Sequence, residues 1–125
     1  ELGYNNFQGT LMTEFGLLTN LFYFGVNDNR LEGPLPSELG LLWNMTRLQV
    51  QKNQFTGNIP ASWGRMAQLE QLMAEGNKLG GTIPNTLCEL TKDVLRQFIV
   101  DCVDKRRGLG YDCEPKCCTL CRDVQ

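Results

Sequence analysis

The chain has 125 residues, of which 42% are hydrophobic and 21% charged, as is usual for a soluble globular domain. Its net charge of -2 argues against nucleic-acid binding, because proteins that bind nucleic acids usually display a basic face. The sequence has no histidine, which excludes catalytic groups of the Ser/His/Asp and Cys/His types. No apolar run is long enough to span a membrane.

The first hundred or so residues repeat themselves at a fixed interval of 24. The phrase GPLPSELG is followed 24 residues later by GNIPASWG and then by GGTIPNTL. Matched columns at this spacing are typical of a solenoid. The columns are Asn5, Asn29, Asn53 and Asn77; Gly9, Gly33, Gly57 and Gly81; Leu11, Leu35, Ile59 and Ile83; Phe7, Leu31, Phe55 and Leu79; Phe15, Leu39, Trp63 and Leu87; Leu18, Leu42, Met66 and Leu90.

Each repeat predicts a short strand, a turn and a short helical segment. Apolar residues alternate with polar ones in three places, which predicts half-buried strands that stack into one parallel sheet. The asparagine after each strand is expected to form hydrogen bonds with backbone groups that the turn leaves unpaired. The glycine column is expected to adopt backbone conformations that other residues disfavour. The three strands are centred on 24–26, 48–50 and 72–74, and a last strand is expected at 95–102. Helical turns are expected at 37–44 and 61–68, after Pro36 and Pro60.

All six cysteines lie in the C-terminal part of the chain, which predicts a disulfide-bonded cap made in an oxidising compartment. Neighbouring cysteines rarely bridge each other, so Cys117 and Cys118 are each expected to bond one of Cys88 and Cys102. The remaining pair is then Cys113 with Cys121. The alternative is a zinc ion held by the four thiolates of CEPKCCTLC, which would leave Cys88 and Cys102 unused. We therefore expect repeats over 1–102 and a cap over 103–125.

The stretch VNDNRLEGPLPSELGLL resembles the LxxNxLxGxLPxxLGxL motif of plant-specific leucine-rich repeats. That family includes the ectodomains of plant receptor-like kinases and the polygalacturonase-inhibiting proteins. The tail DCEPKCCTLC makes the chain similar to short leucine-rich repeat proteins of diatoms and related algae. The resemblance implies an α/β repeat solenoid, a leucine-rich repeat horseshoe with a short parallel sheet on its concave face. The chain departs from the pattern at Met12, where the other copies have proline, and it lacks the usual N-terminal cysteine-paired cap.

The resemblance also implies an extracellular, non-catalytic recognition module, secreted or on the cell surface, without a cofactor or metal. Its partner would be a protein, peptide or glycan bound on the concave face. The strand positions expected to point outward there are Tyr23, Gly25, Asn27, Arg47, Gln49, Gln51, Gln71, Met73, Glu75, Gln97, Ile99 and Asp101. The partner contacts are expected at Tyr23, Arg47, Gln49, Gln71, Met73 and Gln97, a set that includes residue types common at binding hot spots.

The alternative function is a structural or assembly subunit whose repeat faces or ends pack against other chains. It is suggested by the apolar layer of the first repeat, which no earlier segment covers and which would invite association. We expect a missing repeat, a cap or another subunit to cover this layer. Its residues are Leu2, Phe7, Leu11, Phe15 and Leu18.

Three further features have ordinary and functional interpretations. The aromatic residues in the apolar columns are expected in the core: Phe7, Phe15, Phe24, Phe55 and Trp63. Glu14 and Glu38 share a column, and solvated surface is favoured over a pair of catalytic carboxylates. The tripeptide Asn44-Met45-Thr46 is a glycosylation sequon, which together with the cysteines favours export.

Overall fold

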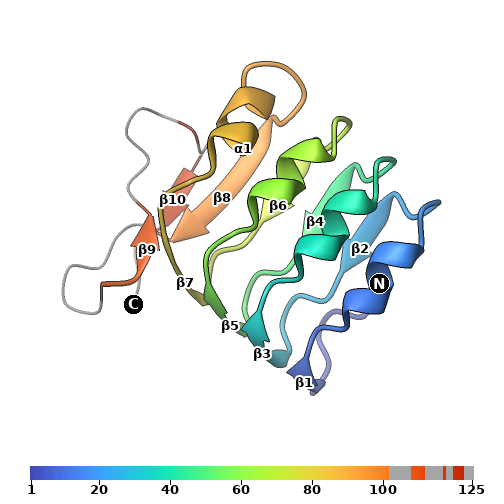
Figure 1. The fold of residues 1–125 in the computed structure, drawn as a ribbon. Helices are drawn as coiled ribbons and strands as arrows, with labels where there is room; N and C mark the ends of the chain where they lie inside the picture. The colour runs from blue at the N-terminus through green and yellow to red at the C-terminus, as the bar shows by residue number, and fades with distance from the viewer. Residues whose placement is uncertain (102–107, 112–116, 118–119, 123–125) are drawn as a thin grey trace.

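The computed structural model describes residues 1–101, 108–111, 117 and 120–122, which form a solenoid with two parallel sheets (Figure 1). The strands of the inner sheet lie in the order β10-β8-β6-β4-β2, and those of the outer sheet in the order β1-β3-β5-β7-β9. The inner strands are β2 (Tyr23–Gly25), β4 (Arg47–Gln49), β6 (Gln71–Met73), β8 (Gln97–Asp101) and β10 (Leu120–Arg122). The outer strands are β1 (Gln8–Thr10), β3 (Arg30–Pro34), β5 (Gln54–Gly57), β7 (Lys78–Gly81) and β9 (Gly110–Tyr111).

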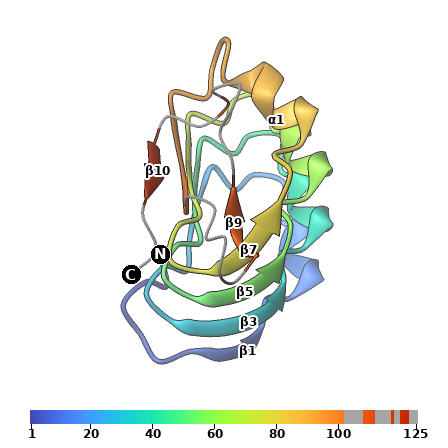
Figure 2. The ribbon, with the colours of Figure 1, turned by 90° about the vertical axis from the view of Figure 1, so that its left-hand side faces the viewer.

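Short helices connect the outer strands β1, β3, β5 and β7 to the next inner strand. Figure 2 shows the helices stacked along one side of the solenoid, with the strands of the outer sheet side by side below them. The segments are the 3₁₀ helices η1 (Thr13–Leu17), η2 (Ser37–Leu41) and η3 (Ala61–Arg65), and the helix α1 (Asn85–Leu90). Pro36 precedes η2 with φ -68° and Met12 precedes η1 with φ -73°, so the missing proline leaves the backbone conformation unchanged.

The apolar columns fill the space between the sheets and the helices, as the 24-residue period predicts. Trp63 and Phe55 are fully buried in the middle repeat, and Phe24, the central residue of β2, is also buried. The expectation that all the aromatic residues lie in the core is wrong for Phe7, whose exposed fraction is 47%. Phe15 is half-buried. Phe7 lies in the first repeat, where packing within the described residues comes from one side only, so its ring stays open to solvent.

The asparagine column forms a ladder of buried side-chain hydrogen bonds that joins consecutive repeats. Asn53 Nδ2 donates to the carbonyl oxygens of Val50 and Gln51 in its own turn, and to that of Val26 in the preceding repeat at 2.9 Å. Its Oδ1 accepts the Leu31 backbone N–H at 3.0 Å. Asn29 and Asn77 repeat this pattern. The predicted role of this column is confirmed, because its amides bond buried backbone groups of the turns, of which Gln51 O also accepts the Asp28 N–H at 3.1 Å.

Glycine is required at two kinds of position. The predicted column has positive φ in every repeat, for example 81° at Gly33 and 82° at Gly57, a conformation that side chains disfavour. A second set lies within the helical turns, where a side chain on Gly40 would collide with the backbone carbonyl of Ser62 in the next turn. These glycines therefore let successive helical turns pack directly against each other.

The outer sheet is the main part of the fold that the sequence did not predict. Its strands pair in parallel, as in Gln8–Arg30, Glu32–Gln54 and Thr56–Lys78. They contain glycine and many exposed polar residues, so they lack the apolar alternation that is typical of a half-buried strand.

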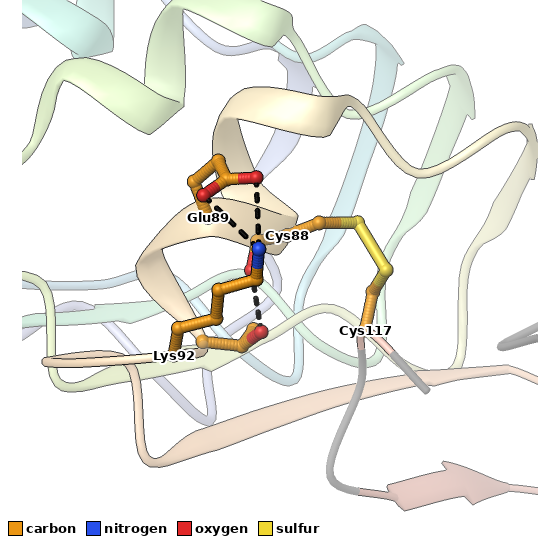
Figure 3. The surroundings of a disulfide bond; sticks show 5 residues. Cys88, Glu89, Lys92 and Cys117 are labelled. Carbon is orange, nitrogen blue, oxygen red and sulfur yellow. Dashed lines mark hydrogen bonds and ion pairs between the residues drawn. A yellow bond between two sulfur atoms is a disulfide. The ribbon is translucent and has the colours of Figure 1, made fainter. Parts of the chain in front are cut away.

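The C-terminal segment is joined to the last repeat by a disulfide between Cys88 and Cys117, with their Cα atoms 4.8 Å apart. Figure 3 shows that the bond extends from α1, and that Lys92, which follows this helix, pairs with Glu89. The prediction that Cys88 bonds one of Cys117 and Cys118 is thus confirmed. The bond uses the Cys117 thiol, which the alternative zinc site would need. Cys102, Cys113 and Cys118 and the side chain of Cys121 lie outside the described residues.

Tyr111 fixes β9 against the outer sheet. Its ring is buried, its Oη donates to Asn58 Oδ1 at 2.6 Å, and it accepts the backbone N–H of Ile59 at 3.0 Å. Burial disfavours the charged phenolate and raises the pKa of Tyr111 to about 12, although the Ile59 hydrogen bond acts in the opposite direction. In the unfolded chain the tyrosine pKa is about 10.

This difference predicts a loss of stability at high pH. The neutral phenol is favoured in the folded state, so its contribution is complete below pH 10 and is lost as the pH rises towards 12. The free energy of unfolding should fall by about 2 kcal/mol over this range, measured by urea unfolding at several pH values. Tyr111→Phe is the control, since it should remove this part of the pH dependence. If the free energy of unfolding fell equally with pH in the wild type and in Tyr111→Phe, the assignment of this pH dependence to Tyr111 would be contradicted.

Candidate ligand-binding face

The inner sheet presents one broad face away from the helices, here called the concave face. The parallel register aligns Tyr23 with Arg47, Arg47 with Gln71, and Gln71 with Gln97. In the next row along the strands, Gln49 is aligned with Met73. The sheet therefore brings the six predicted contact residues together, one or two from each of four neighbouring strands.

A row of side-chain hydrogen bonds crosses this face from β2 to β8. Tyr23 Oη donates to Gln49 Oε1 at 3.0 Å. Gln49 Nε2 donates to Gln71 Oε1 at 2.7 Å, and Gln71 Nε2 donates to Gln97 Oε1 at 2.6 Å. Each amide uses one donor and one acceptor at most within this row, so N–H groups and lone pairs remain for a partner. We call these four residues the amide row.

Arg47 and Met73 flank the amide row. Among the residues that the structure describes, ion pairs occur at Lys52 with Asp28 and at Lys92 with Glu89, and the exposed Arg47 guanidinium takes part in neither. Met73 is half-buried, and its sulfur lies 4.0 Å from Gln51 Nε2. The face thus combines neutral hydrogen-bonding groups, one unpaired cation and a small apolar surface.

The other six strand positions expected to point outward are buried, and the expectation that they are open to a partner is wrong. At the N-terminal end, a side chain at Gly25 would collide with the carboxylate of Glu1. At the other end, Asp101 accepts the backbone N–H groups of Gly76 and Asn77, so it closes the ladder of turns. The buried positions are Gly25, Asn27, Gln51, Glu75, Ile99 and Asp101.

Known proteins share the sequence pattern and the fold. A family profile described as Leucine Rich Repeat matches residues 68–90. The solved TDR receptor is 44% identical with a TM-score of 0.71 over 73% of this chain.

The repeats are leucine-rich repeats of the plant-specific type.

Two further structures with leucine-rich repeats come from Arabidopsis receptor kinases. The ectodomain of HAESA, in complex with an N-terminally extended IDA peptide hormone, is 31% identical with a TM-score of 0.70 over 78% of this chain. The ectodomain of GASSHO1/SCHENGEN3, in complex with CASPARIAN STRIP INTEGRITY FACTOR 2, is 37% identical with a TM-score of 0.67 over 69%. The present chain spans 16% of the TDR and HAESA chains and 10% of GASSHO1/SCHENGEN3. A search of curated proteins found no significant match.

The remaining sequence-predicted features lie away from the concave face of the leucine-rich repeats. Glu14 is exposed on η1, whereas Glu38 on η2 is half-buried and accepts the Ser37 hydroxyl at 3.1 Å. Full solvation is therefore wrong for Glu38. Asn44 is half-buried in the turn that precedes β4. In the described part of the chain, no helix has the length and apolar character needed to cross a bilayer.

The amide row itself was not foreseen from the sequence. A signal was present, because glutamine occurs at outward positions of three neighbouring strands. The bonded pairs are separated alternately by 26 and 22 residues rather than by the 24 residues of the repeat, so the repeat period does not predict which residues bond.

Proposed function

We propose that this chain is an extracellular, non-catalytic recognition module that binds a peptide or an extended segment of a protein across its concave face. The observation that carries the proposal is the amide row, which runs across neighbouring strands from β2 to β8 and keeps unused donors and acceptors. An extended backbone offers the complementary N–H and C=O groups. The complex of HAESA with a peptide hormone supports a peptide over a glycan as partner.

Arg47 and Met73 would give the site its specificity. An unpaired guanidinium favours a ligand with a carboxylate or another acidic group nearby. Met73 offers a polarisable surface that adapts to an apolar side chain. Placement outside the cell is supported by the Cys88–Cys117 disulfide, since such bonds persist in oxidising compartments.

The test uses a displayed library of random linear peptides selected against the 125-residue chain. The substitution pair Arg47→Glu and Met73→Glu should weaken the selected peptides by about tenfold or more. The control pair is Arg65→Glu and Ala61→Glu on η3, where both residues are exposed. Each pair replaces one cation by an anion and adds one further anion, so the change in net charge is the same.

The outcome decides where the site lies. Equal affinity for the wild type and the concave pair, a loss confined to the control pair, or failure to enrich any peptide would each count against peptide binding on this face. Circular dichroism of both variants checks that the repeats remain folded.

A structural or assembly role is the second candidate, and it is supported by exposed apolar residues in the first repeat. Leu2, Phe7 and Leu18 are open to solvent there, while Leu11 is buried. A repeat, a cap or another subunit that packs on these residues would remove this exposed surface from water. In that case self-association, measured by light scattering, would be unaffected by the Arg47 and Met73 substitutions.

A further inference from the structure

Two turns between the helices and the inner sheet expose large apolar side chains. Leu17 and Leu41, at the ends of η1 and η2, have exposed fractions of 75% and 54%. Phe22 and Trp43 lie in the same turns, with exposed fractions of 65% and 57%. We call these four residues the apolar ridge. A grouping of this kind on a surface normally indicates that something covers it.

The apolar ridge is not required by the repeat. One period further along, the position of Leu41 is taken by Arg65 and that of Trp43 by Ala67. The position of Phe22 is taken first by Thr46 and then by Glu70. Polar or small residues therefore suit the same fold, so the ridge is a local property of the first two repeats.

Asn44 lies in the second of these turns, directly after Trp43 and between η2 and β4. The turn is held by hydrogen bonds from the Trp43 N–H to Leu41 O and from the Met45 N–H to Leu42 O, both at 3.0 Å. The Asn44 side chain is half-buried and makes no hydrogen bond to any residue that the structure describes. Asn44 begins the sole Asn-X-Ser/Thr sequon of the sequence.

The turn is also tied to the ridge residue of the preceding repeat. The Thr46 hydroxyl donates to the backbone carbonyl of Phe22 at 2.9 Å, and the Thr46 N–H donates to the same oxygen at 2.8 Å. Asn44 directly follows Trp43 in the sequence. The hydrogen bonds of Thr46 hold the same turn close to Phe22. A group attached to the Asn44 amide nitrogen starts at the edge of the apolar ridge.

We propose that Asn44 carries an N-linked glycan whose first sugars pack over Trp43 and the apolar ridge. In the attachment step the Asn44 amide nitrogen bonds to the anomeric carbon of a lipid-linked oligosaccharide. The lipid pyrophosphate leaves with the electrons of the broken C–O bond, and the nitrogen loses one proton. The C–H faces of sugars suit the electron-rich face of an indole ring. The proposal needs export of the chain but does not depend on ligand binding at the concave face.

The two tryptophans make the packing measurable. Trp63 is fully buried, so quenching of the fluorescence by acrylamide reports on the exposed Trp43. The chain is secreted from a eukaryotic host, and its intact mass is compared before and after treatment with an amidase that releases N-linked glycans. We expect excess mass that the enzyme removes, and removal should increase the fraction of fluorescence that acrylamide quenches.

Two variants complete the test. Asn44→Gln should have no excess mass and should be quenched like the deglycosylated protein. Trp43→Phe should keep the glycan, and its quenching should be the same with and without treatment. A secreted wild type without excess mass overturns the modification and leaves the ridge open to a protein partner. A glycan whose removal leaves quenching unchanged overturns the packing.

Discussion

Replacing Trp63 by alanine should lower the free energy of unfolding by about 3–5 kcal/mol. Trp63 is fully buried in the middle repeat, and its Nε1 donates to the Pro36 carbonyl at 2.8 Å. Alanine would leave a cavity between the helical turns and would remove the shorter of the two hydrogen bonds that this carbonyl accepts, the other coming from the Leu39 N–H at 3.3 Å. Since a domain of this size is stable by only about 5–15 kcal/mol, the variant should be partly unfolded well below the midpoint of the wild type.

The measurement is urea unfolding followed by circular dichroism, because the substitution removes the fluorescent reporter of the core. Trp43→Ala is the matched control, as it removes the same side chain from an exposed position and should change stability by less than about 0.5 kcal/mol. Trp63→Leu should fall between the two, since the same column holds leucine at Leu39 and Leu87. A Trp63→Ala protein as stable as Trp43→Ala would mean that the core is not packed as described.

Much of this fold follows from the 24-residue period because each repeat packs on a copy of itself. Such packing dictates the residue type in every buried column, so Leu48, Leu72 and Asn53 were assigned correctly from the sequence alone. The prediction that Phe7 is buried was wrong because the residues of its column are buried only where a repeat packs on both sides. The outer sheet was missed because its pairing depends on backbone shape around the positive-φ glycines, and that shape leaves no apolar alternation.

The candidate site was predictable as a set of positions but not as an arrangement. Strand alternation identified Arg47, Gln71 and Gln97 as outward residues, because the period of a strand is two. It did not distinguish them from Ile99 or Asp101, which neighbours at the C-terminal end bury. Nor did it predict the amide row, since the partner of each glutamine depends on side-chain conformation. The bonds of Gln49 to Tyr23 and to Gln71 join residues that are not aligned in the strand register.

Replacing Asn53 by alanine should cost about 3 kcal/mol, although the side chain is small and polar. Its amide makes three donated bonds, to Val26, Val50 and Gln51, and accepts one from Leu31. Alanine leaves the buried Leu31 N–H without its acceptor, a cost that exceeds the loss of the bond itself. It also removes one donor from each carbonyl, although Val26, Val50 and Gln51 keep donors from Asn29, Asn77 and Asp28. Asn20→Ala is the control, because Asn20 is exposed and makes no hydrogen bond to the described residues. Urea unfolding followed by Trp63 fluorescence should separate the two variants clearly. If Asn53→Ala were as stable as Asn20→Ala, water would have to replace the amide in the turn, and the ladder would not be what joins the repeats.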